Sequence, residues 1–354
     1  MNILDTVTKF QISEHIIGYS PLGNGHINTT YLIKTKGKNY YVLQRINNNA
    51  FKDVDKLMNN IYNTTAFLSS KGFETLKVVK TKDDNLYYQD DSGYYRLYSY
   101  IDDVICYEGV SDLDSVYSCA KAFGLLHKAL RDYDASTLYE VIPNFHNTKD
   151  RYDAFIKAVE SNPCDRVKDC RSEIESLKKH EKEYSLLVDS IANGDIRLAV
   201  THNDPKINNV LFDRNTGDIR AVIDLDTIMP GSYLYDYGDA LRSLFTGEYE
   251  DSKDLSKIGI NYPLFEMYTK GYLSEMKGVL NDKEVNLLTF SVYLLTAELA
   301  LRFLTDYLNG DVYFKVAYPE HNLVRARTQL KLANEIYDHL GILNEIVHKC
   351  YKNS

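Results

Sequence analysis

The chain has 354 residues, a formal net charge of −9 at pH 7 and an apolar share of 44%. This length exceeds that of a typical single domain, so we expect two subdomains with a sizeable core. No basic block stands out in this acidic chain, which argues against a nucleic-acid partner.

The cysteines and the apolar stretches bear on the compartment. The five cysteines form no C-x-x-C pair, which is typical of reduced thiols in a cytoplasmic protein. The first twelve residues, MNILDTVTKFQI, have no basic region followed by an apolar core, so we expect no signal peptide. The most apolar long stretch, residues 287–304, carries Glu298 and Arg302, which indicates a buried helix and no membrane span.

Residues 16–33 are predicted to form a strand, a glycine turn and a second strand, with Gly23, Asn24 and Gly25 at the turn. Glycines let a backbone bend sharply and approach a phosphate without a Cβ in the way. An ordinary hairpin turn explains Gly-Asn-Gly equally well. The position near the N-terminus, ahead of the polar loop described below, favours a phosphate-binding loop.

The next predicted strand, residues 39–46, offers Gln44 and Arg45 as contacts for the same phosphate. Successive side chains of a strand point to opposite faces, so only one of the two can face the ligand. Gln44 shares a face with Val42, whereas Arg45 shares a face with Leu43. Arg binds phosphate through a bidentate fork and Gln is a weaker, neutral partner; both assignments stay open.

Helical and strand patterns alternate over the next hundred residues and then become helical. A helix is predicted over residues 53–70, strands over 77–81, 85–89 and 94–101, and a hinge over 102–106. Apolar residues repeat on one helical face after Ser111, where we expect His127 at the surface or as a cap. Asp236 is expected to cap a helix or to support a site, not to catalyse. Residues 262–339 are predicted to be helical throughout.

The most informative stretch is residues 201–212, THNDPKINNVLF, which lies between two β-prone runs. The second run ends at Asp224-Leu225-Asp226. Phosphoryl transfer from a nucleotide uses an Asp that faces the acceptor hydroxyl, an Asn five residues later, and a second Asp at a strand end that binds Mg²⁺. Asp204, Asn209 and Asp224 have this spacing, with Asp226 as an assisting group. Turn chemistry alone is the alternative, because Asp and Asn are common in loops.

With these residues the chain resembles the aminoglycoside phosphotransferase and choline kinase superfamily, whose usual loop is H-G-D-x-x-x-x-N. Asn203 stands where that loop has Gly, and Leu225 stands where the later strand has Trp. Both departures resemble the N-acetylhexosamine 1-kinase branch. That branch is similar across nearly the whole chain, in GNGHINTTYLI, LQRIN, THNDPKINNVLFD, VIDLDTIMPGS, YDYGDALRS and RFLTDYLNGDVYFKV.

The resemblance implies an α+β, two-lobe, protein-kinase-like fold. It implies an antiparallel-sheet lobe over residues 1–102, a mainly helical lobe over 103–354, and nucleotide between them. The implied reaction is transfer from ATP, with Mg²⁺, to the anomeric C1 hydroxyl of N-acetylglucosamine or N-acetylgalactosamine. Asp204 is the expected base, and His26, Arg302 and Tyr313 are the expected sugar contacts.

Several alternatives stay open beside this interpretation. Without the resemblance, Arg302 would be expected to pair with Asp306 one helical turn away, and Tyr313 to lie in the core. The acceptor could be choline, an aminoglycoside or another sugar, although the absence of Trp gives little support to an aromatic cage for choline. The strand at 39–46 lacks the usual Lys and the helix at 53–70 lacks Glu, which favours a nucleotide-binding pseudokinase; Asp204, Asn209 and Asp224 oppose it.

Overall fold

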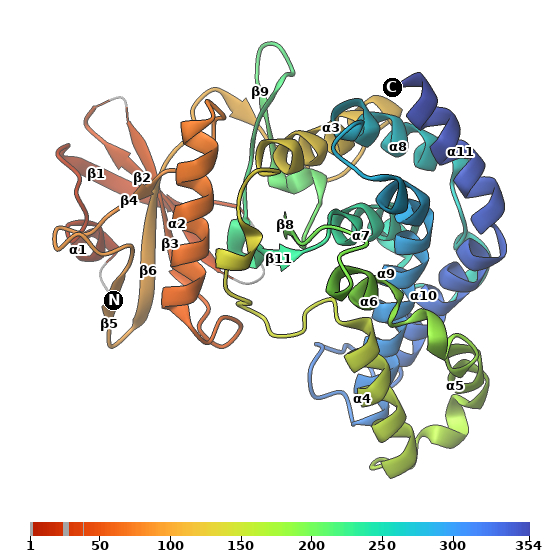
Figure 1. Ribbon diagram of the computed structural model, residues 1–354. Helices are drawn as coiled ribbons and strands as arrows, with labels where there is room; N and C mark the ends of the chain where they lie inside the picture. The colour runs from red at the N-terminus through yellow and green to blue at the C-terminus, as the bar shows by residue number, and fades with distance from the viewer. Residues whose placement is uncertain (1–2, 24–27, 38) are drawn as a thin grey trace. The chain divides into compact units, whose positions relative to one another are not determined.

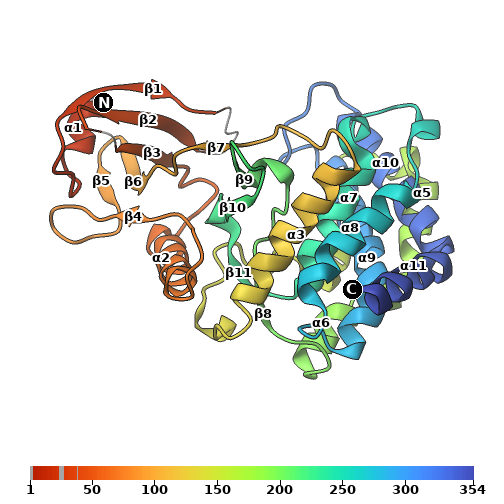
Figure 2. The ribbon, with the colours of Figure 1, turned by 90° about the horizontal axis from the view of Figure 1, so that it is seen from above.

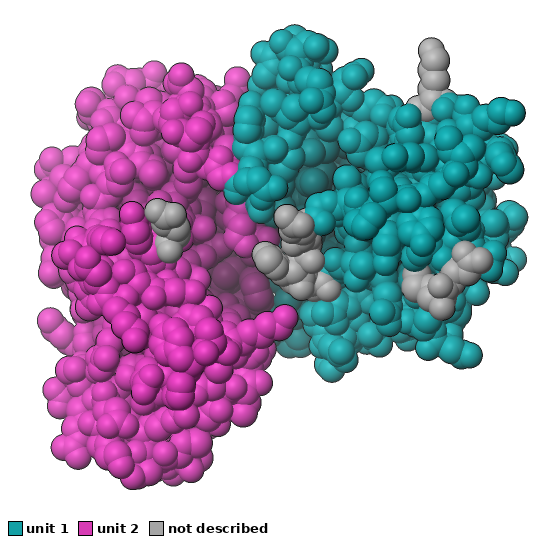
Figure 3. Space-filling view, turned by 180° about the vertical axis from the view of Figure 1, so that it is seen from behind, with its two compact units in different colours: residues 1–108, 132–143, 208–230 teal, residues 109–131, 144–207, 231–354 magenta. Residues whose placement is uncertain are grey.

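The structure is a computed structural model that describes residues 3–23, 28–37 and 39–354 (Figure 1). By packing, the chain divides into two units, which are described separately and are coloured in Figure 3. Unit 1 consists of residues 1–108, 132–143 and 208–230, and unit 2 of residues 109–131, 144–207 and 231–354. The functional lobes at 1–102 and 103–354 stay a prediction, because packing alone defines the two units.

Unit 1 carries the strands of the N-terminal half. Its elements are α1 (Ile3–Val7), β1 (Ile16–Pro21), β2 (Thr29–Thr35), β3 (Tyr40–Ile46), α2 (Val54–Ser70), β4 (Val78–Val79), β5 (Tyr88–Asp90), β6 (Gly93–Ser99), β7 (Val104–Ile105), β9 (Val210–Asp213) and β10 (Ile219–Val222), followed by β11 (Met229–Gly231), whose last residue belongs to unit 2. The helix predicted over residues 53–70 is confirmed as α2, with Asp53 as its N-cap.

The first sheet of unit 1 is antiparallel, in the order β1-β2-β3-β6-β4, with β5 also paired to β6. Leu43 of β3 is opposite Leu97 of β6, and Gln44 is opposite Arg96. Leu43 and Leu97 pack in one buried cluster with Phe10 and residues of α1. Because side chains alternate across a strand, Gln44 and Arg96 therefore point to the opposite face. Figures 1 and 2 both show α2 alongside this sheet.

A second, smaller sheet in unit 1 joins β10, β9 and β7 in that order. Val222 pairs with Val210, and the backbone N–H of Ile223 donates to the carbonyl of Asn209 at 2.8 Å. The antiparallel register thus brings the start of β9 and the end of β10 together. Residues of the predicted hinge, Val104 and Ile105, form β7 on the other edge of β9.

Unit 2 is mainly helical. Its elements are α3 (Leu113–Ala129), α4 (Thr148–Ser161), α5 (Arg171–Lys178), α6 (Leu186–Ala192), β8 (Ala199–Thr201), α7 (Tyr233–Thr246), α8 (Tyr262–Met276), α9 (Asp282–Leu308), α10 (His321–Asp338) and α11 (Leu340–Asn353). Together with the sheet of unit 1, this helical content confirms the predicted α+β class.

The long helix α9 lies at the centre of unit 2, in contact with α4, α7, α10 and α11. By length and composition alone α9 could cross a membrane, but 78% of its most apolar window is buried inside the structure. Burial on most sides explains why the helix is apolar nearly all round. The predicted buried helix at residues 287–304 is thereby confirmed.

Two glycines let α3 and α8 pack closely. A Cβ on Gly124 of α3 would meet the backbone oxygen of Tyr272, and a Cβ on Gly271 of α8 would meet the backbone oxygen of Tyr117. Larger residues at these positions would force the helices apart. The close approach places His127 of α3 against the hydroxyl of Tyr272, where it contributes to the site described next.

Candidate active site

In unit 1, the end of the β9–β10 hairpin brings Asn209 and Asp224 to the same edge. Asn209 directly precedes β9, and Asp224 follows Ile223, whose backbone N–H donates to Asn209. Asp224 is exposed and has a φ of 59°, a left-handed conformation that Asp tolerates better than most residues. An amide oxygen and a carboxylate oxygen are ligands that suit Mg²⁺, which also keeps waters and phosphate oxygens. The donor set therefore fits the predicted metal.

Asp226, two residues later, is held differently. It is only 4% exposed, and its Oδ1 lies 2.5 Å from Nη1 of Arg96 on β6. Its Oδ2 accepts a hydrogen bond from Nδ2 of Asn28 at 2.6 Å. Burial opposes the charge of Arg96, but the Asp226 carboxylate keeps the pKa of that guanidinium raised. Both oxygens of Asp226 thus have protein partners, so its predicted assistance to the metal stays a prediction and is indirect in this geometry.

Arg96 is the residue of this region that sequence reasoning missed. Its Nε donates to Oε1 of Gln44 at 2.9 Å, and Nε2 of Gln44 donates to Thr30 at 3.1 Å. Arg45 lies on the opposite face, where Nη2 donates to the carbonyl of Ser92. Of the two predicted phosphate contacts, Gln44 is therefore the one that shares a face with the buried cation.

The predicted glycine loop is only partly described. Gly23 has a φ of 69°, the left-handed conformation that favours glycine. Asn24, Gly25 and His26 lie outside the described residues, so their predicted roles in phosphate and sugar binding stay predictions.

Helix α2 contains no Glu, and a different polar side chain ties it to the segment after Asp226. Asn60 is 1% exposed, and its Nδ2 donates to the carbonyls of Tyr139 at 2.8 Å and Ile228 at 2.9 Å. Its Oδ1 accepts from the backbone N–H of Tyr139 at 2.9 Å. A neutral amide with three hydrogen bonds therefore connects three segments of unit 1.

In unit 2, Asp204 lies in the loop that follows β8. It is half-buried, and its Oδ1 is 2.6 Å from Nζ of Lys206. Burial opposes the ammonium charge and Asp204 favours it, so that the pKa of Lys206 is raised. The preceding Asn203 has a φ of 64°. Asn tolerates this region better than other residues with a Cβ, which explains why it can replace Gly here.

A fully buried carboxylate on α7 binds the backbone of this loop. Oxygens of Asp236, on α7, accept the backbone N–H groups of His202 and Asn203, both at 2.7 Å. Nε2 of His127 lies 2.7 Å from the same carboxylate. Burial raises the pKa of Asp236, but the bonds to His127 and His202 outweigh it and leave the pKa below its usual value.

These contacts settle two expectations. Ser232, not Asp236, caps α7, so the capping alternative for Asp236 is wrong; Asp236 binds the backbone of the loop after β8, and its support of an active site stays a prediction. His127 is fully buried between Asp236 and Tyr272, so its prediction as a surface or capping residue is also wrong. The sequence signal was present, because a His within an apolar helical stripe needs a buried polar partner.

Arg302 of α9 lies among aromatic rings. Its guanidinium carbon is 5.7 Å from the ring centre of Phe145, 6.0 Å from that of Tyr313 and 5.6 Å from that of Phe314. Among the described residues the guanidinium makes no ion pair. The Asp306 alternative is wrong, because that carboxylate binds backbone N–H groups of residues 312–314. Tyr313 is 71% exposed, so it is not a core residue either.

Two further pairs of polar side chains in unit 2 contain candidate site residues. Oε1 of Glu298 lies 3.0 Å from Nδ1 of His146, whose Nε2 is buried without a hydrogen-bond partner in the described part of the chain. Asp239 is 2.7 Å from Nε of Arg242. Burial raises the pKa of Asp239, but the charges of Arg242, His146 and Lys206 lower it below its usual value. Sequence reasoning missed Asp239 and His146.

The chain is similar to known phosphotransferases and kinases. A profile of the phosphotransferase enzyme family matches residues 18–256. An aminoglycoside phosphotransferase from Alicyclobacillus acidocaldarius is similar in structure, with a TM-score of 0.63, 13% identity, and 99% of this chain and 97% of that chain covered. A microcompartment-associated aminopropanol kinase has a TM-score of 0.58 and 15% identity, with coverage of 96% and 97%. An amicoumacin kinase solved with AMP-PNP, Ca²⁺ and amicoumacin has a TM-score of 0.57 and 14% identity, with coverage of 93% and 92%. At these identities the likeness establishes the fold.

Proposed function

The chain belongs to the phosphotransferase enzyme family, in the superfamily of aminoglycoside phosphotransferases and choline kinases, and from that premise we propose its substrates. We propose that it is an ATP- and Mg²⁺-dependent kinase of the anomeric C1 hydroxyl of N-acetylhexosamines, N-acetylglucosamine or N-acetylgalactosamine. ATP as the donor is supported by the nucleotide analogue bound to the similar amicoumacin kinase and by the spacing of Asp204, Asn209 and Asp224.

In this proposal unit 2 supplies the base. Asp204 accepts the proton of the acceptor hydroxyl as the hydroxyl oxygen bonds to the γ-phosphorus and the bond from that phosphorus to ADP breaks. The products are the sugar 1-phosphate and ADP. Asp236 keeps the backbone of His202 and Asn203 in place, so that Asp204 does not have to be ordered at each turnover.

Unit 1 supplies the nucleotide side of the proposal. Asn209 and Asp224 would hold Mg²⁺, which neutralises charge on the phosphates when bound. Gln44 and Arg96 share a face of the sheet, and we assign the phosphate-facing role to Gln44, with Arg96 holding both Gln44 and Asp226 in position. Gly23, Asn24 and Gly25 remain the proposed phosphate-binding loop, and Arg45, on the opposite face of β3, is the less favoured alternative to Gln44 as the phosphate contact.

Arg302 is the observation that supports a neutral acceptor. Its guanidinium lies beside three aromatic rings and makes no ion pair with a described residue, while its charge helps to lower the pKa of the buried Glu298 one helical turn earlier. A quaternary or primary ammonium group at these rings would meet a like charge, whereas sugar hydroxyls or an acetamide carbonyl could accept its N–H groups. Tyr313 offers an exposed ring for a sugar face, and His26 is retained as a proposed contact.

The likeness to an aminopropanol kinase makes an amino alcohol the second candidate acceptor. A coupled ATP-turnover assay distinguishes an amino alcohol from an N-acetylhexosamine as the acceptor. The panel contains N-acetylglucosamine, N-acetylgalactosamine, the 1-O-methyl glycoside of N-acetylglucosamine, choline, aminopropanol and an aminoglycoside. Turnover with the two free sugars and none with the methyl glycoside is expected. Preference for choline, aminopropanol or the aminoglycoside would overturn the sugar assignment. Nucleotide binding without turnover of any acceptor would support a pseudokinase.

We also infer a cytoplasmic location. The five cysteines, Cys106, Cys119, Cys164, Cys170 and Cys350, are all free. Free thiols of this number suit a reducing compartment. We propose no nucleic-acid and no membrane partner, since the chain is acidic and α9, the one long apolar helix among the described residues, is mostly buried.

A further inference from the structure

The loop between α9 and α10, residues 309–320, exposes its side chains and yet has its backbone fixed. Val312 is 80% exposed and Tyr313 is 71% exposed. Exposed apolar side chains contribute little burial, so Val312 and Tyr313 do little to hold this loop in place, whereas Phe314 packs against Phe303 of α9 with ring centres 4.6 Å apart. The loop backbone is held in addition by hydrogen bonds to side chains of α9 and α10.

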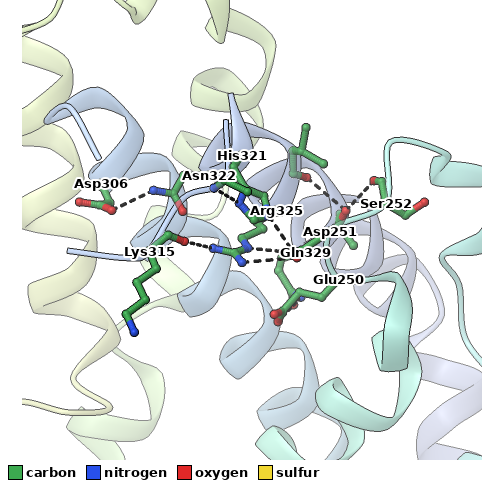
Figure 4. A network of polar contacts seen from close by, with 12 residues as sticks. Glu250, Asp251, Ser252, Asp306, Lys315, His321, Asn322, Arg325 and Gln329 are labelled. Atoms are coloured by element: carbon green, nitrogen blue, oxygen red, sulfur yellow. Dashed lines mark hydrogen bonds and ion pairs between the residues drawn. The ribbon is translucent and has the colours of Figure 1, made fainter. Parts of the chain in front are cut away.

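Asp306 provides most of these bonds. It is 5% exposed, and its Oδ1 accepts the backbone N–H groups of Val312 at 3.0 Å and Tyr313 at 2.9 Å. Its Oδ2 accepts the N–H of Phe314 at 3.0 Å and Nδ2 of Asn322 at 2.9 Å, the latter drawn in Figure 4. Three consecutive N–H groups therefore converge on one carboxylate, and hydrogen bonds to a charged acceptor are stronger than neutral ones.

The far half of the loop is fixed from α10. Nη1 of Arg325 donates to the carbonyl of Lys315 at 3.0 Å, and the N–H of Ala317 donates to Nδ1 of His321 at 3.0 Å. Asp251 lies 2.6 Å from Nε of Arg325 and 3.0 Å from Nε2 of His321 (Figure 4). The segment that contains Tyr313 and Phe314 is thus held on both sides.

We propose that Asp306 is a positioning residue for the acceptor. Its carboxylate fixes the backbone of residues 312–314 and so places the rings of Tyr313 and Phe314 beside Arg302, 6.0 Å and 5.6 Å from the guanidinium carbon. The role rests on the proposed function, since it matters only if Arg302 and Tyr313 contact the acceptor. Asp306 itself touches no substrate and acts through the loop.

The test compares Asp306→Asn with a control on the same helix. Glu284, 1% exposed, also accepts backbone N–H groups, those of Asn281 at 2.8 Å and Arg197 at 3.0 Å. It lies about 30 Å along α9 from Asp306, at 1.5 Å per residue. Glu284→Gln therefore loses an equivalent bond remote from the loop. We expect Asp306→Asn to raise the KM for the sugar by about tenfold with kcat and the KM for ATP little changed, and Glu284→Gln to change none of them.

A second measurement follows the loop directly. The chain contains 30 Tyr but no Trp, so Val312→Trp places a single tryptophan, excited at the red edge where tyrosine does not absorb, on the exposed part of the loop. We expect Asp306→Asn to lower its fluorescence anisotropy, and Asp306→Glu, which keeps the charge but moves it, to have a smaller effect in the same direction. If Asp306→Asn does not fold, Asp306→Glu carries both measurements.

The outcomes separate this proposal from the proposed function. If Arg302→Ala raises the KM for the sugar while the Asp306 variants do not, the positioning role is wrong and the acceptor site stands. If Arg302→Ala leaves the KM for the sugar unchanged, the acceptor assignment fails before Asp306 is considered. Equal effects of Asp306→Asn and Glu284→Gln would show that Asp306 contributes stability alone.

Discussion

Two regions of the molecule stabilise a buried carboxylate in different ways. They are the end of the β9–β10 hairpin in unit 1 and the loop after β8 in unit 2. Each carries a carboxylate with a proposed function, Asp224 or Asp204, and has a second, buried carboxylate that holds the local structure. Asp226 is fixed by the cation of Arg96. Asp236 is fixed by two backbone N–H groups and His127. A buried charge can thus be compensated by a counter-ion or by convergent donors, and the two solutions respond differently to the same Asp→Asn change.

The largest expected effect is on the rate of the chemical step in unit 2. Asp204→Asn keeps the shape and removes the base, so kcat should fall by about 10²–10⁴. ATP binding, measured by calorimetry, should be preserved, because no residue of unit 1 changes. Turnover near that of the unmodified enzyme would remove Asp204 from this role.

In unit 1, substitutions of Asp224 and Asp226 should affect different properties of the enzyme, the Mg²⁺ requirement and the stability of the fold. Asp224→Asn should raise the Mg²⁺ concentration needed for half-maximal activity sharply, with little change in the denaturation midpoint, because Asp224 is exposed and Asn also tolerates the left-handed φ of 59° at this position. Asp226→Asn should instead lower the free energy of unfolding by about 3–5 kcal/mol, since it leaves the buried guanidinium of Arg96 without its counter-ion. Chemical denaturation and Mg²⁺ titration of both variants check this pair. Full activity in excess chelator would contradict the metal assignment.

Arg302 should show a smaller and more selective effect. Arg302→Ala removes the donors proposed for the sugar, so kcat/KM for the sugar should fall by about ten- to a hundredfold. The KM for ATP should stay nearly unchanged, because the predicted nucleotide contacts lie in unit 1. Steady-state kinetics with each substrate varied in turn measures both values, and an equal rise in the two KM values would argue against a sugar contact.

The smallest effect concerns acid stability. The pKa values of Asp236 and Glu298 in the folded chain lie below their usual values of 3.8 and 4.5. Their contribution to stability is therefore present above those usual values and is lost as the pH falls through the lower, folded pKa. We expect the unfolding free energy to fall below about pH 4.5, with a slope that Asp236→Asn reduces by up to about 1.4 kcal/mol per pH unit. Urea denaturation at a series of pH values measures the unfolding free energy of both proteins. Parallel plots of that free energy against pH would contradict this prediction.

The sequence predicted the fold class because it depends on local patterns, whereas the roles of the candidate site residues stay predictions. The spacing of Asp204, Asn209 and Asp224 is a motif, and the helix over residues 53–70 carries its N-cap and apolar repeat in one segment. The partners of the supporting residues are far away in sequence. Arg96 and Asp226 are 130 positions apart, and His127 and Asp236 are 109 apart. No local pattern joins such pairs, so the partner of His127 could not be predicted and sequence reasoning placed that residue at the surface.

The most direct test of the sugar 1-kinase assignment is the ³¹P NMR spectrum of the product formed from ATP and N-acetylglucosamine. We predict one new phosphomonoester resonance, coupled to the anomeric proton, and none when the 1-O-methyl glycoside replaces the free sugar. A phosphorus coupled to protons of another sugar carbon, or phosphorylation of the methyl glycoside, would contradict the account.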